Sequence, residues 1–162
     1  MKVVLLAGGF GTRIFEESQF KPKPMIEVEG KPLLWYIMKQ FASFGYDDFI
    51  ICAGYKQEYI KKWFFDYFTF SSDVCFDYRN DRQMLSQINN KTEKWKVQIV
   101  DTGLTSNTGE RIKLVKDLIG DEDFFISYGD CISDINIDSL IQKHNELSKI
   151  LTITAINYPS TK

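Results

Sequence analysis

Val3-Val4-Leu5-Leu6-Ala7-Gly8-Gly9-Phe10-Gly11-Thr12-Arg13 is the stretch that decides the fold, and Lys21-Pro22-Lys23-Pro24-Met25 follows it closely. Short apolar runs of this kind, rich in β-branched residues, are typical of a central parallel strand that is covered on both faces. Ligands of such sheets bind just beyond the carboxyl ends of the strands. The glycine-rich turn after the run therefore predicts where a ligand binds.

Phosphate chemistry is favoured by this turn and by the lysine that follows it. Glycines lack a Cβ, so the amides at Gly8, Gly9 and Gly11 can approach phosphate oxygens and form an anion-binding nest. Arg13 would add a planar, permanently charged fork, and Lys23 a compact point charge. Prolines on both sides of Lys23 stiffen the backbone that presents it. The combination suits a triphosphate.

A glycine-rich turn after a first strand is common in α/β proteins, and by itself it does not establish a phosphate site. A Walker loop is excluded because Gly11 is followed by Thr12 and Arg13 instead of Lys and Ser or Thr. A dinucleotide fingerprint needs a third glycine where Ile14 stands, so NAD binding is not expected.

At these residues the sequence resembles the sugar-1-phosphate nucleotidyltransferase family, and most closely the branch that acts on CTP and glucose-1-phosphate. The resemblance runs from Met1 to about Ile156. It implies a Rossmann-like α/β fold with a mostly parallel sheet and helices on both faces. The segments that carry the closer resemblance are Tyr36-Ile37-Met38, Asp48-Phe49-Ile50-Ile51-Cys52-Ala53-Gly54-Tyr55-Lys56, Val100-Asp101-Thr102-Gly103, Thr108-Gly109-Glu110-Arg111 and Tyr128-Gly129-Asp130.

Composition sets limits on the class of protein. A chain of 162 residues is long enough for one domain with a real core, so we expect a single domain over 1–162. A formal charge of -2 gives no general reason to expect nucleic-acid binding. The three cysteines are far apart and indicate reduced thiols. No apolar stretch approaches the roughly 20 residues of a spanning helix, and Met1 leads directly into a strand, so we expect a cytoplasmic protein.

The order of the elements predicts the α/β class. Strands are expected at Val3–Ala7, Phe49–Ala53, Val97–Asp101, Phe124–Ser127 and Leu151–Ile156. Helices are expected over Leu34–Phe41 with a stop at Gly45, and at Lys56–Phe68, Thr108–Ile119 and Asp138–Leu147, the last capped by Asp138 or a neighbour. Alternating strands and helices indicate a parallel sheet built from βαβ units. Apolar residues at helical spacing from Tyr59 to Phe68 indicate a helix lying on that sheet.

The segment from Ser71 to Lys96 is less regular, and we expect it to form a hairpin or a long loop. In the resembled enzymes this region contributes to subunit association and nucleotide enclosure. A homo-oligomer is therefore implied by the resemblance and not by composition.

A second group of residues points to a metal. The apolar run that begins at Asp123 ends in Gly129 and Asp130, at the edge where ligands of parallel sheets bind. Mg²⁺ prefers oxygen ligands and commonly uses one or two carboxylates plus substrate phosphates. Asp130 is therefore the candidate magnesium ligand. The alternative is a strand-end carboxylate that caps the next turn, but the resembled family has a metal-binding Asp in its own Gly-Asp pair.

The resemblance implies in-line attack by glucose-1-phosphate on the α-phosphate of CTP, which gives CDP-glucose and pyrophosphate. Arg13 is then expected to bind the departing β- and γ-phosphates, and Lys23 the α-phosphate, and both are catalytic candidates. In the resembled family Arg111 lies near the nucleotide, where it could contact the base or the sugar-phosphate. The alternative is that Arg111 is a solvated residue in a first helical turn. The expected nucleotide-binding residues are Leu6, Ala7, Gly8, Gly9, Gly11, Thr12, Arg13, Lys23, Thr102, Gly103 and Arg111.

Members of the resembled family continue well past Lys162. The further part normally supplies the rest of the sheet, most sugar-phosphate contacts and a second metal-binding carboxylate. We therefore expect a nucleotide-binding portion, truncated at the carboxyl end. Two functions stay open: an active enzyme of which this sequence is one part, or a nucleotide-binding fragment or regulatory module without independent catalysis. UTP and dTTP enzymes carry similar glycine and lysine signatures, so only the later motifs favour CTP.

Overall fold

The computed structural model describes residues 1–10, 21–77, 84–89 and 92–155. The chain divides into two compact units, Met1–Ile132 and Ser133–Lys162. The prediction of one domain over the whole chain stays a prediction. Within the described residues, no helix is long and apolar enough to cross a membrane. The elements of the first unit are β1 (Lys2–Ala7), η1 (Lys23–Met25), β2 (Glu27–Val28), β3 (Lys31–Pro32), α2 (Leu33–Ser43), β4 (Asp48–Ala53), α3 (Gln57–Phe70), β5 (Asp73–Asp77), β6 (Met84–Asn89), β7 (Lys96–Asp101), α4 (Thr108–Leu114), α5 (Lys116–Ile119) and β8 (Phe124–Tyr128).

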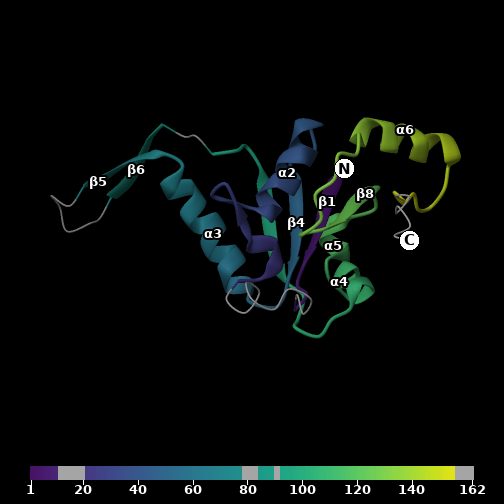
Figure 1. The fold of residues 1–162 in the computed structure, drawn as a ribbon, viewed down its shortest axis with the longest axis horizontal. Helices are drawn as coiled ribbons and strands as arrows, with labels where there is room; N and C mark the ends of the chain where they lie inside the picture. The colour runs from purple at the N-terminus through teal and green to yellow at the C-terminus, as the bar shows by residue number, and fades with distance from the viewer. Residues whose placement is uncertain (11–20, 78–83, 90–91, 156–162) are drawn as a thin grey trace, which may run out of the picture. The chain divides into compact units, whose positions relative to one another are not determined.

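The centre of the first unit is a sheet of four strands in the order β7-β4-β1-β8 (Figure 1). All three pairings are parallel, so the predicted parallel sheet is confirmed. The register places Ala7 opposite Ala53, and Ala53 opposite Asp101. The carboxyl ends of β1, β4 and β7 therefore lie in one row. This row is the edge at which the sequence predicts ligand binding.

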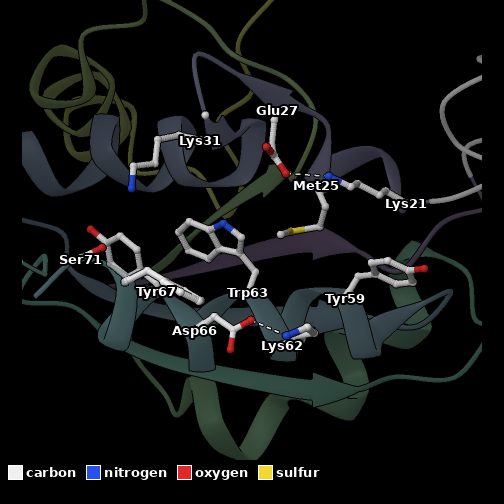
Figure 2. Close-up of a pocket in the computed structure, with 12 residues that line it drawn as sticks. Lys21, Met25, Glu27, Lys31, Tyr59, Lys62, Trp63, Asp66, Tyr67 and Ser71 are labelled. Carbon is white, nitrogen blue, oxygen red and sulfur yellow. Dashed lines mark hydrogen bonds and ion pairs between the residues drawn. The ribbon is translucent and has the colours of Figure 1, made fainter. Parts of the chain in front are cut away.

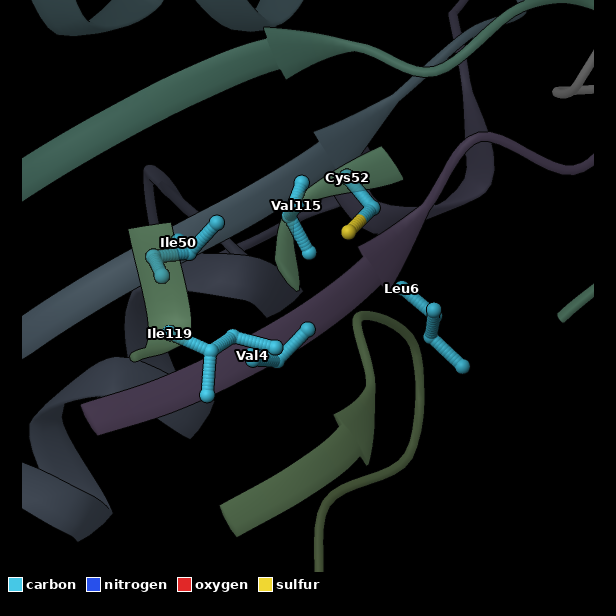
Figure 3. Close-up of a cluster of buried hydrophobic side chains, with 6 residues drawn as sticks. All are labelled: Val4, Leu6, Ile50, Cys52, Val115 and Ile119. Carbon is cyan, nitrogen blue, oxygen red and sulfur yellow. The ribbon is translucent and has the colours of Figure 1, made fainter. Parts of the chain in front are cut away.

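One face of the sheet is covered by α4 and α5. Alternate residues of a strand point to the same face, which brings the even-numbered positions of β1 and β4 together. Val115, between the two short helices, and Ile119 of α5 complete a buried cluster, drawn in Figure 3. The buried members of this cluster are Val4, Leu6, Ile50, Cys52, Val115 and Ile119.

Helices α2 and α3 lie on the other side of the sheet in Figure 1. The buried residues of α2 recur at helical spacing, and the ring of Phe41 contacts that of Phe125 in β8 with centroids 5.3 Å apart. Helix α2 stops where predicted, because Gly45 has φ +88° and its amide donates to the carbonyl of Ala42 at 3.0 Å. Helices on both faces of the sheet confirm the predicted fold class.

Two predictions in the first unit need correction. The predicted helix Thr108–Ile119 is broken at Val115, where φ is -103° and ψ is 9°. Val115 is fully buried, and its β-branched side chain has a slightly lower helix propensity than an unbranched one, so little is lost when this residue leaves the helical conformation. The second correction concerns the predicted apolar stripe of α3. Among the described side chains of this stripe, only Ile60 is fully buried, and Tyr59 is exposed. The stripe is therefore only partly a sheet-facing surface.

The segment after α3 forms the hairpin that the sequence offered as one alternative. Strands β5 and β6 pair antiparallel, with Cys75 opposite Ser86. Residues 78–83 and 90–91 lie outside the described part of the chain.

In the second unit, α6 (Ile137–Leu147) begins close to the predicted point. Its cap is Asn136, a neighbour of Asp138, whose side chain accepts from the amide of Ser139 at 2.8 Å. The predicted strand Leu151–Ile156 is wrong over 151–155, which have no regular structure, and Ile156 lies outside the described residues. A strand needs a neighbour to satisfy its backbone, and no described strand pairs with this segment.

Thiol reactivity gives a first test of the core. Cys52 is buried, while Cys75 and Cys131 are exposed. Burial raises the pKa of the Cys52 thiol from its ordinary 9.0 to about 11, and the positive charge of Arg111 opposes this only partly. At pH 8 an aromatic disulfide reagent should label Cys75 and Cys131 at once, and Cys52 at least about tenfold more slowly until denaturant is added. Equal rates for all thiols in the folded chain would contradict this packing.

The raised pKa of Cys52 also predicts how the stability of the fold changes with pH. The folded chain keeps the Cys52 proton to about pH 11, whereas the unfolded chain loses it near pH 9.0. The contribution of this group to stability is therefore complete below the unfolded pKa and is lost as the pH rises through the folded one.

Candidate nucleotide site at the strand ends

Three backbone segments meet beyond the carboxyl ends of the aligned strands. Gly8 follows β1, Gly54 follows β4 and Thr102 follows β7. The amide of Tyr55 donates to the carbonyl of Gly8 at 3.3 Å, and the amide of Thr102 donates to the carbonyl of Ala53 at 2.9 Å. These bonds extend the sheet past its strands and join the segments to one another. They form the floor of the candidate site, which we call the strand-end floor (residues 8–9, 53–55 and 102–103).

Arg111 lies within this floor. Its Nη1 donates to Thr102 Oγ1 at 2.6 Å and to the carbonyl of Gly103 at 2.9 Å, and it approaches the carbonyl of Ala53 at 3.3 Å. Its Nη2 donates to the carbonyl of Gly8 at 3.0 Å. Only 5% of the residue is exposed. The alternative of a solvated residue in a first helical turn is therefore wrong. A contact between Arg111 and a nucleotide stays a prediction.

The side chains of β7 and the residue after it also hold the floor in place. Thr102 is 1% exposed, and its hydroxyl donates to the carbonyl of Ala53 at 2.7 Å. Asp101 accepts from the amide of Gly103 at 2.9 Å. This hydrogen bond, assisted by Gln57, lowers the pKa of Asp101. Because the Thr102 hydroxyl is already paired on both sides, the backbone at 102–103 is the part best placed to meet a ligand.

Asn107 and Glu110 fix the start of the helix that carries Arg111. Asn107 Oδ1 accepts from the amide of Glu110 at 3.0 Å, and Glu110 Oε2 accepts from the amide of Asn107 at 2.8 Å. This is a reciprocal capping box. Sequence reasoning missed the pair, although an Asn followed three residues later by a Glu was the available signal.

Removing this cap should loosen α4. Asn107→Ala is expected to lower the free energy of unfolding by about 1 kcal/mol, because the helix start loses its side-chain acceptor. Urea unfolding followed by circular dichroism measures this, with Asn145→Ala on α6 as the matched control. A loss for Asn107→Ala no larger than for the control would count against the capping role.

Lys23 and Asp130 meet at the end of β8. The amide of Gly129 donates to the carbonyl of Leu6 at 2.9 Å. A Cβ at Gly129 would lie 3.2 Å from Pro24 Cγ, so the lack of a side chain lets η1 come close. As a result Lys23 Nζ lies 2.8 Å from Asp130 Oδ2, with both side chains partly exposed. The structure thus brings the predicted phosphate-binding lysine and the predicted metal ligand into contact.

Residues 2–162 match the family described as Nucleotidyl transferase. The chain belongs to this family. It is 46% identical over 156 residues to glucose-1-phosphate cytidylyltransferase of Salmonella typhimurium, covering 96% of this chain and 60% of that protein. It is 40% identical over 158 residues to the probable glucose-1-phosphate cytidylyltransferase of Bacillus subtilis, covering 97% of this chain and 61% of that protein. The chain thus spans about 60% of the length of these curated relatives.

Solved structures show the same fold for this chain. HddC from Yersinia pseudotuberculosis, solved in complex with GMP-PN, superposes with a TM-score of 0.63 at 26% identity, over 88% of this chain and 53% of that one. UDP-glucose pyrophosphorylase, solved with UDP-glucose, gives a TM-score of 0.61 at 23% identity, over 89% of this chain and 54% of that one. The second likeness bears on the fold alone.

Several predicted site residues lie outside the described part of the chain. Gly11, Thr12 and Arg13 fall in the segment 11–20, so their roles stay predictions. Leu6 and Ala7 are the last two residues of β1 and are buried, and Gly9 is exposed. Of the glycines expected to form the phosphate cradle, the structure therefore describes Gly8 and Gly9, which directly follow β1.

An aromatic pair on the rim was not anticipated. The rings of Phe10 and Tyr55 have centroids 5.3 Å apart, and Phe10 is 49% exposed. The pair links the segment after β1 with the segment after β4. A flat ring exposed beside the strand-end floor is suited to pack against a planar ligand group.

Asp130 fits a magnesium ligand by its chemistry. Within the described residues, no three His, Cys, Asp or Glu side chains gather in a way that could hold a metal. One partly exposed carboxylate at the ligand-binding edge matches the way Mg²⁺ binds through one or two carboxylates and substrate phosphates.

A separate pocket of about 350 Å³ lies between α3 and the segment 21–31 (Figure 2). Its aromatic wall comes from α3, where the rings of Trp63 and Tyr67 stack with centroids 4.7 Å apart. Two of its lysines are already paired with carboxylates, Lys21 with Glu27 at 2.7 Å and Lys62 with Asp66 at 2.5 Å. No residue of the strand-end floor lines it. The pocket is thus less suited to a triphosphate than the strand-end floor is.

Proposed function

We propose that this chain is the nucleotide-binding portion of a glucose-1-phosphate cytidylyltransferase, which makes CDP-glucose and pyrophosphate from CTP and glucose-1-phosphate. The observation that carries the proposal is the meeting of Lys23 with Asp130, 2.8 Å apart, just past the carboxyl end of β8 and beside the end of β1. Similarity to cytidylyltransferases over nearly the whole chain supports the choice of base and sugar.

The backbone at the strand ends supplies the nucleotide site. Gly8, Gly9 and Gly11 form the cradle that directly follows Leu6 and Ala7, with Thr12 at its end. The backbone at Thr102 and Gly103 meets the base edge. Arg111 is the last residue of the proposed nucleotide-binding set. Its guanidinium donates to the carbonyls of Gly103 and Gly8 and so supports the backbone on which the nucleotide is proposed to lie.

The reaction needs little covalent chemistry from the protein. An oxygen of the sugar phosphate attacks the α-phosphorus, the bond from that phosphorus to the bridging oxygen breaks, and pyrophosphate leaves with the electron pair. Lys23 binds the α-phosphate, on which charge develops, and Arg13 binds the departing β- and γ-phosphates. Positioning and charge neutralisation account for most of the rate gain in such transfers.

The ion pair between Lys23 and Asp130 prepares the site for this chemistry. Asp130 would hold magnesium, which supplies further charge neutralisation on the phosphates when bound. Lys23 Nζ and Asp130 Oδ2 lie 2.8 Å apart, so each side chain neutralises the other. When the nucleotide binds, Lys23 exchanges the carboxylate for a phosphate oxygen, so the amine keeps an anionic partner throughout. A homo-oligomer belongs to the same proposal, with the β5–β6 region as the expected contact.

The test adds magnesium and glucose-1-phosphate to the purified chain with CTP, UTP or dTTP in turn. Titration calorimetry measures nucleotide binding, and a coupled phosphate assay measures pyrophosphate release. We expect CTP to bind at least about tenfold more tightly than UTP. Binding with release supports the enzyme, and binding without release supports the nucleotide-binding module. Failure of all three nucleotides to bind would contradict both.

A further inference from the structure

We propose that Arg111 is a positioning residue that ties the three segments of the strand-end floor into one rigid surface, and that Gly8 lacks a side chain because this guanidinium occupies the space. The inference rests on the proposed function in one respect, namely that the floor holds a nucleotide. It differs from the expectation that Arg111 acts mainly as a nucleotide contact and that Gly8 serves mainly the phosphates.

The hydrogen bonds of the guanidinium show the tie. Within the described chain, its acceptors come from the ends of three different strands: the Gly8 carbonyl after β1, the Ala53 carbonyl at the end of β4, and the Thr102 hydroxyl and Gly103 carbonyl after β7. Arg111 is itself a residue of α4, so the helix fixes the backbone from which the guanidinium extends. Nη1 serves the ends of β4 and β7, and Nη2 reaches the Gly8 carbonyl after β1, so the second nitrogen of the planar fork is what adds the third strand end.

Close approach of the backbone gives independent support. A Cβ built on Gly8 would overlap the Nη1 and Cζ atoms of Arg111. A Cβ on Gly54 would come too close to the carbonyl of Gly103 and would lie 2.9 Å from Arg111 Nη1. Gly9, in contrast, has open space around its α-carbon. Close packing against the guanidinium therefore requires glycine at positions 8 and 54. At position 9 there is room for a side chain.

The electrostatics of the tie suit an anionic ligand. The described hydrogen-bond acceptors of Arg111 are carbonyl and hydroxyl oxygens, and no described salt bridge involves it, although its charge contributes in small part to the lowered pKa of Asp101. The guanidinium of an arginine is a permanent cation. That charge lies under the segments where the nucleotide is proposed to bind. The tie therefore shapes the floor and also favours a negatively charged occupant.

The test is a double-mutant cycle of Gly8→Ala and Arg111→Ala, read by thermal unfolding and by CTP affinity well below the unfolding temperature of every variant. Gly8→Ala alone should lower the unfolding midpoint by about 5 °C and weaken CTP binding at least about tenfold, because the new methyl group displaces the guanidinium. In the Arg111→Ala background, Gly8→Ala should add less than about twofold to the loss of affinity. Gly9→Ala is the matched control for stability only, and its midpoint should stay within about 1 °C.

Arg111→Lys is the second variant in case Arg111→Ala fails to fold. An ammonium group can bind only part of the acceptor set, so this variant should fold but bind CTP about tenfold more weakly. A folded Arg111→Ala or Arg111→Lys chain with unchanged CTP affinity would overturn the positioning role. The positioning role would also be overturned if Gly8→Ala weakened CTP binding by the same factor with and without Arg111. If the unsubstituted chain binds no nucleotide, the proposed function fails, while the unfolding cycle still tests the tie by itself.

Discussion

Lys23→Met is expected to lower pyrophosphate release at least about 100-fold and to weaken CTP binding about tenfold. Two effects combine in this result. The α-phosphate loses its cation, and Asp130 loses the partner that lies 2.8 Å away. Methionine keeps most of the volume and the apolar stem of lysine, so the fold should be retained.

Lys21→Met is the matched control for this substitution. Lys21 is also on the segment before η1, but it pairs with Glu27 at the surface and lies on the separate α3 pocket. Its removal should change CTP affinity by less than about twofold, because exposed ion pairs contribute little. Asp130→Asn, measured alongside, should remove the magnesium dependence of CTP binding. Equal losses for Lys21→Met and Lys23→Met would count against a specific role of Lys23.

Phe49→Ala is expected to give the largest loss of stability in the chain, about 3–5 kcal/mol. Phe49 is fully buried in the central strand β4, and its ring contacts Trp95 with centroids 5.6 Å apart. Truncation leaves a cavity between the sheet and the residues that cover it, which close packing prevents from collapsing fully. Urea unfolding followed by tryptophan fluorescence measures the change.

Phe65→Ala tests the same chemical change at an exposed position. Phe65 on α3 is 81% exposed, so its truncation should change the free energy of unfolding by less than about 0.5 kcal/mol. A loss for Phe49→Ala below about 1 kcal/mol would show that this residue is not part of the core. The pair of variants thus separates burial from the loss of an aromatic ring in general.

The four strands of the parallel sheet were predictable because each is rich in β-branched or aromatic residues and is followed by glycine or a polar residue, whereas the short strands β2 and β3 gave no such signal. Val3–Ala7 and Phe49–Ala53 are buried from end to end, and such runs have few alternatives to a central parallel strand. The break at Val115 was not predictable, because local periodicity continues through it and only tertiary burial interrupts the helix. Leu151 shows the reverse case, since an apolar run alone does not supply a strand partner.

The candidate site was predictable as a set of residues but not as a network. Lys23 and Asp130 were each assigned to the strand-end edge from local motifs. Their contact depends on the packing of η1 against Gly129, which no local pattern reveals. Arg111 shows the limit most clearly. From sequence it is one residue of a first helical turn, and only the register of β1, β4 and β7 explains how one side chain reaches all of their ends.

A crystal structure of the chain grown with CTP and magnesium tests the central claim most directly. We predict that the triphosphate lies over Gly8 and Gly9, that Lys23 Nζ has left Asp130 Oδ2 for an α-phosphate oxygen, and that the cytosine faces the backbone at Thr102 and Gly103. A nucleotide bound in the α3 pocket beside Trp63, with the ion pair between Lys23 and Asp130 unchanged, would contradict the account.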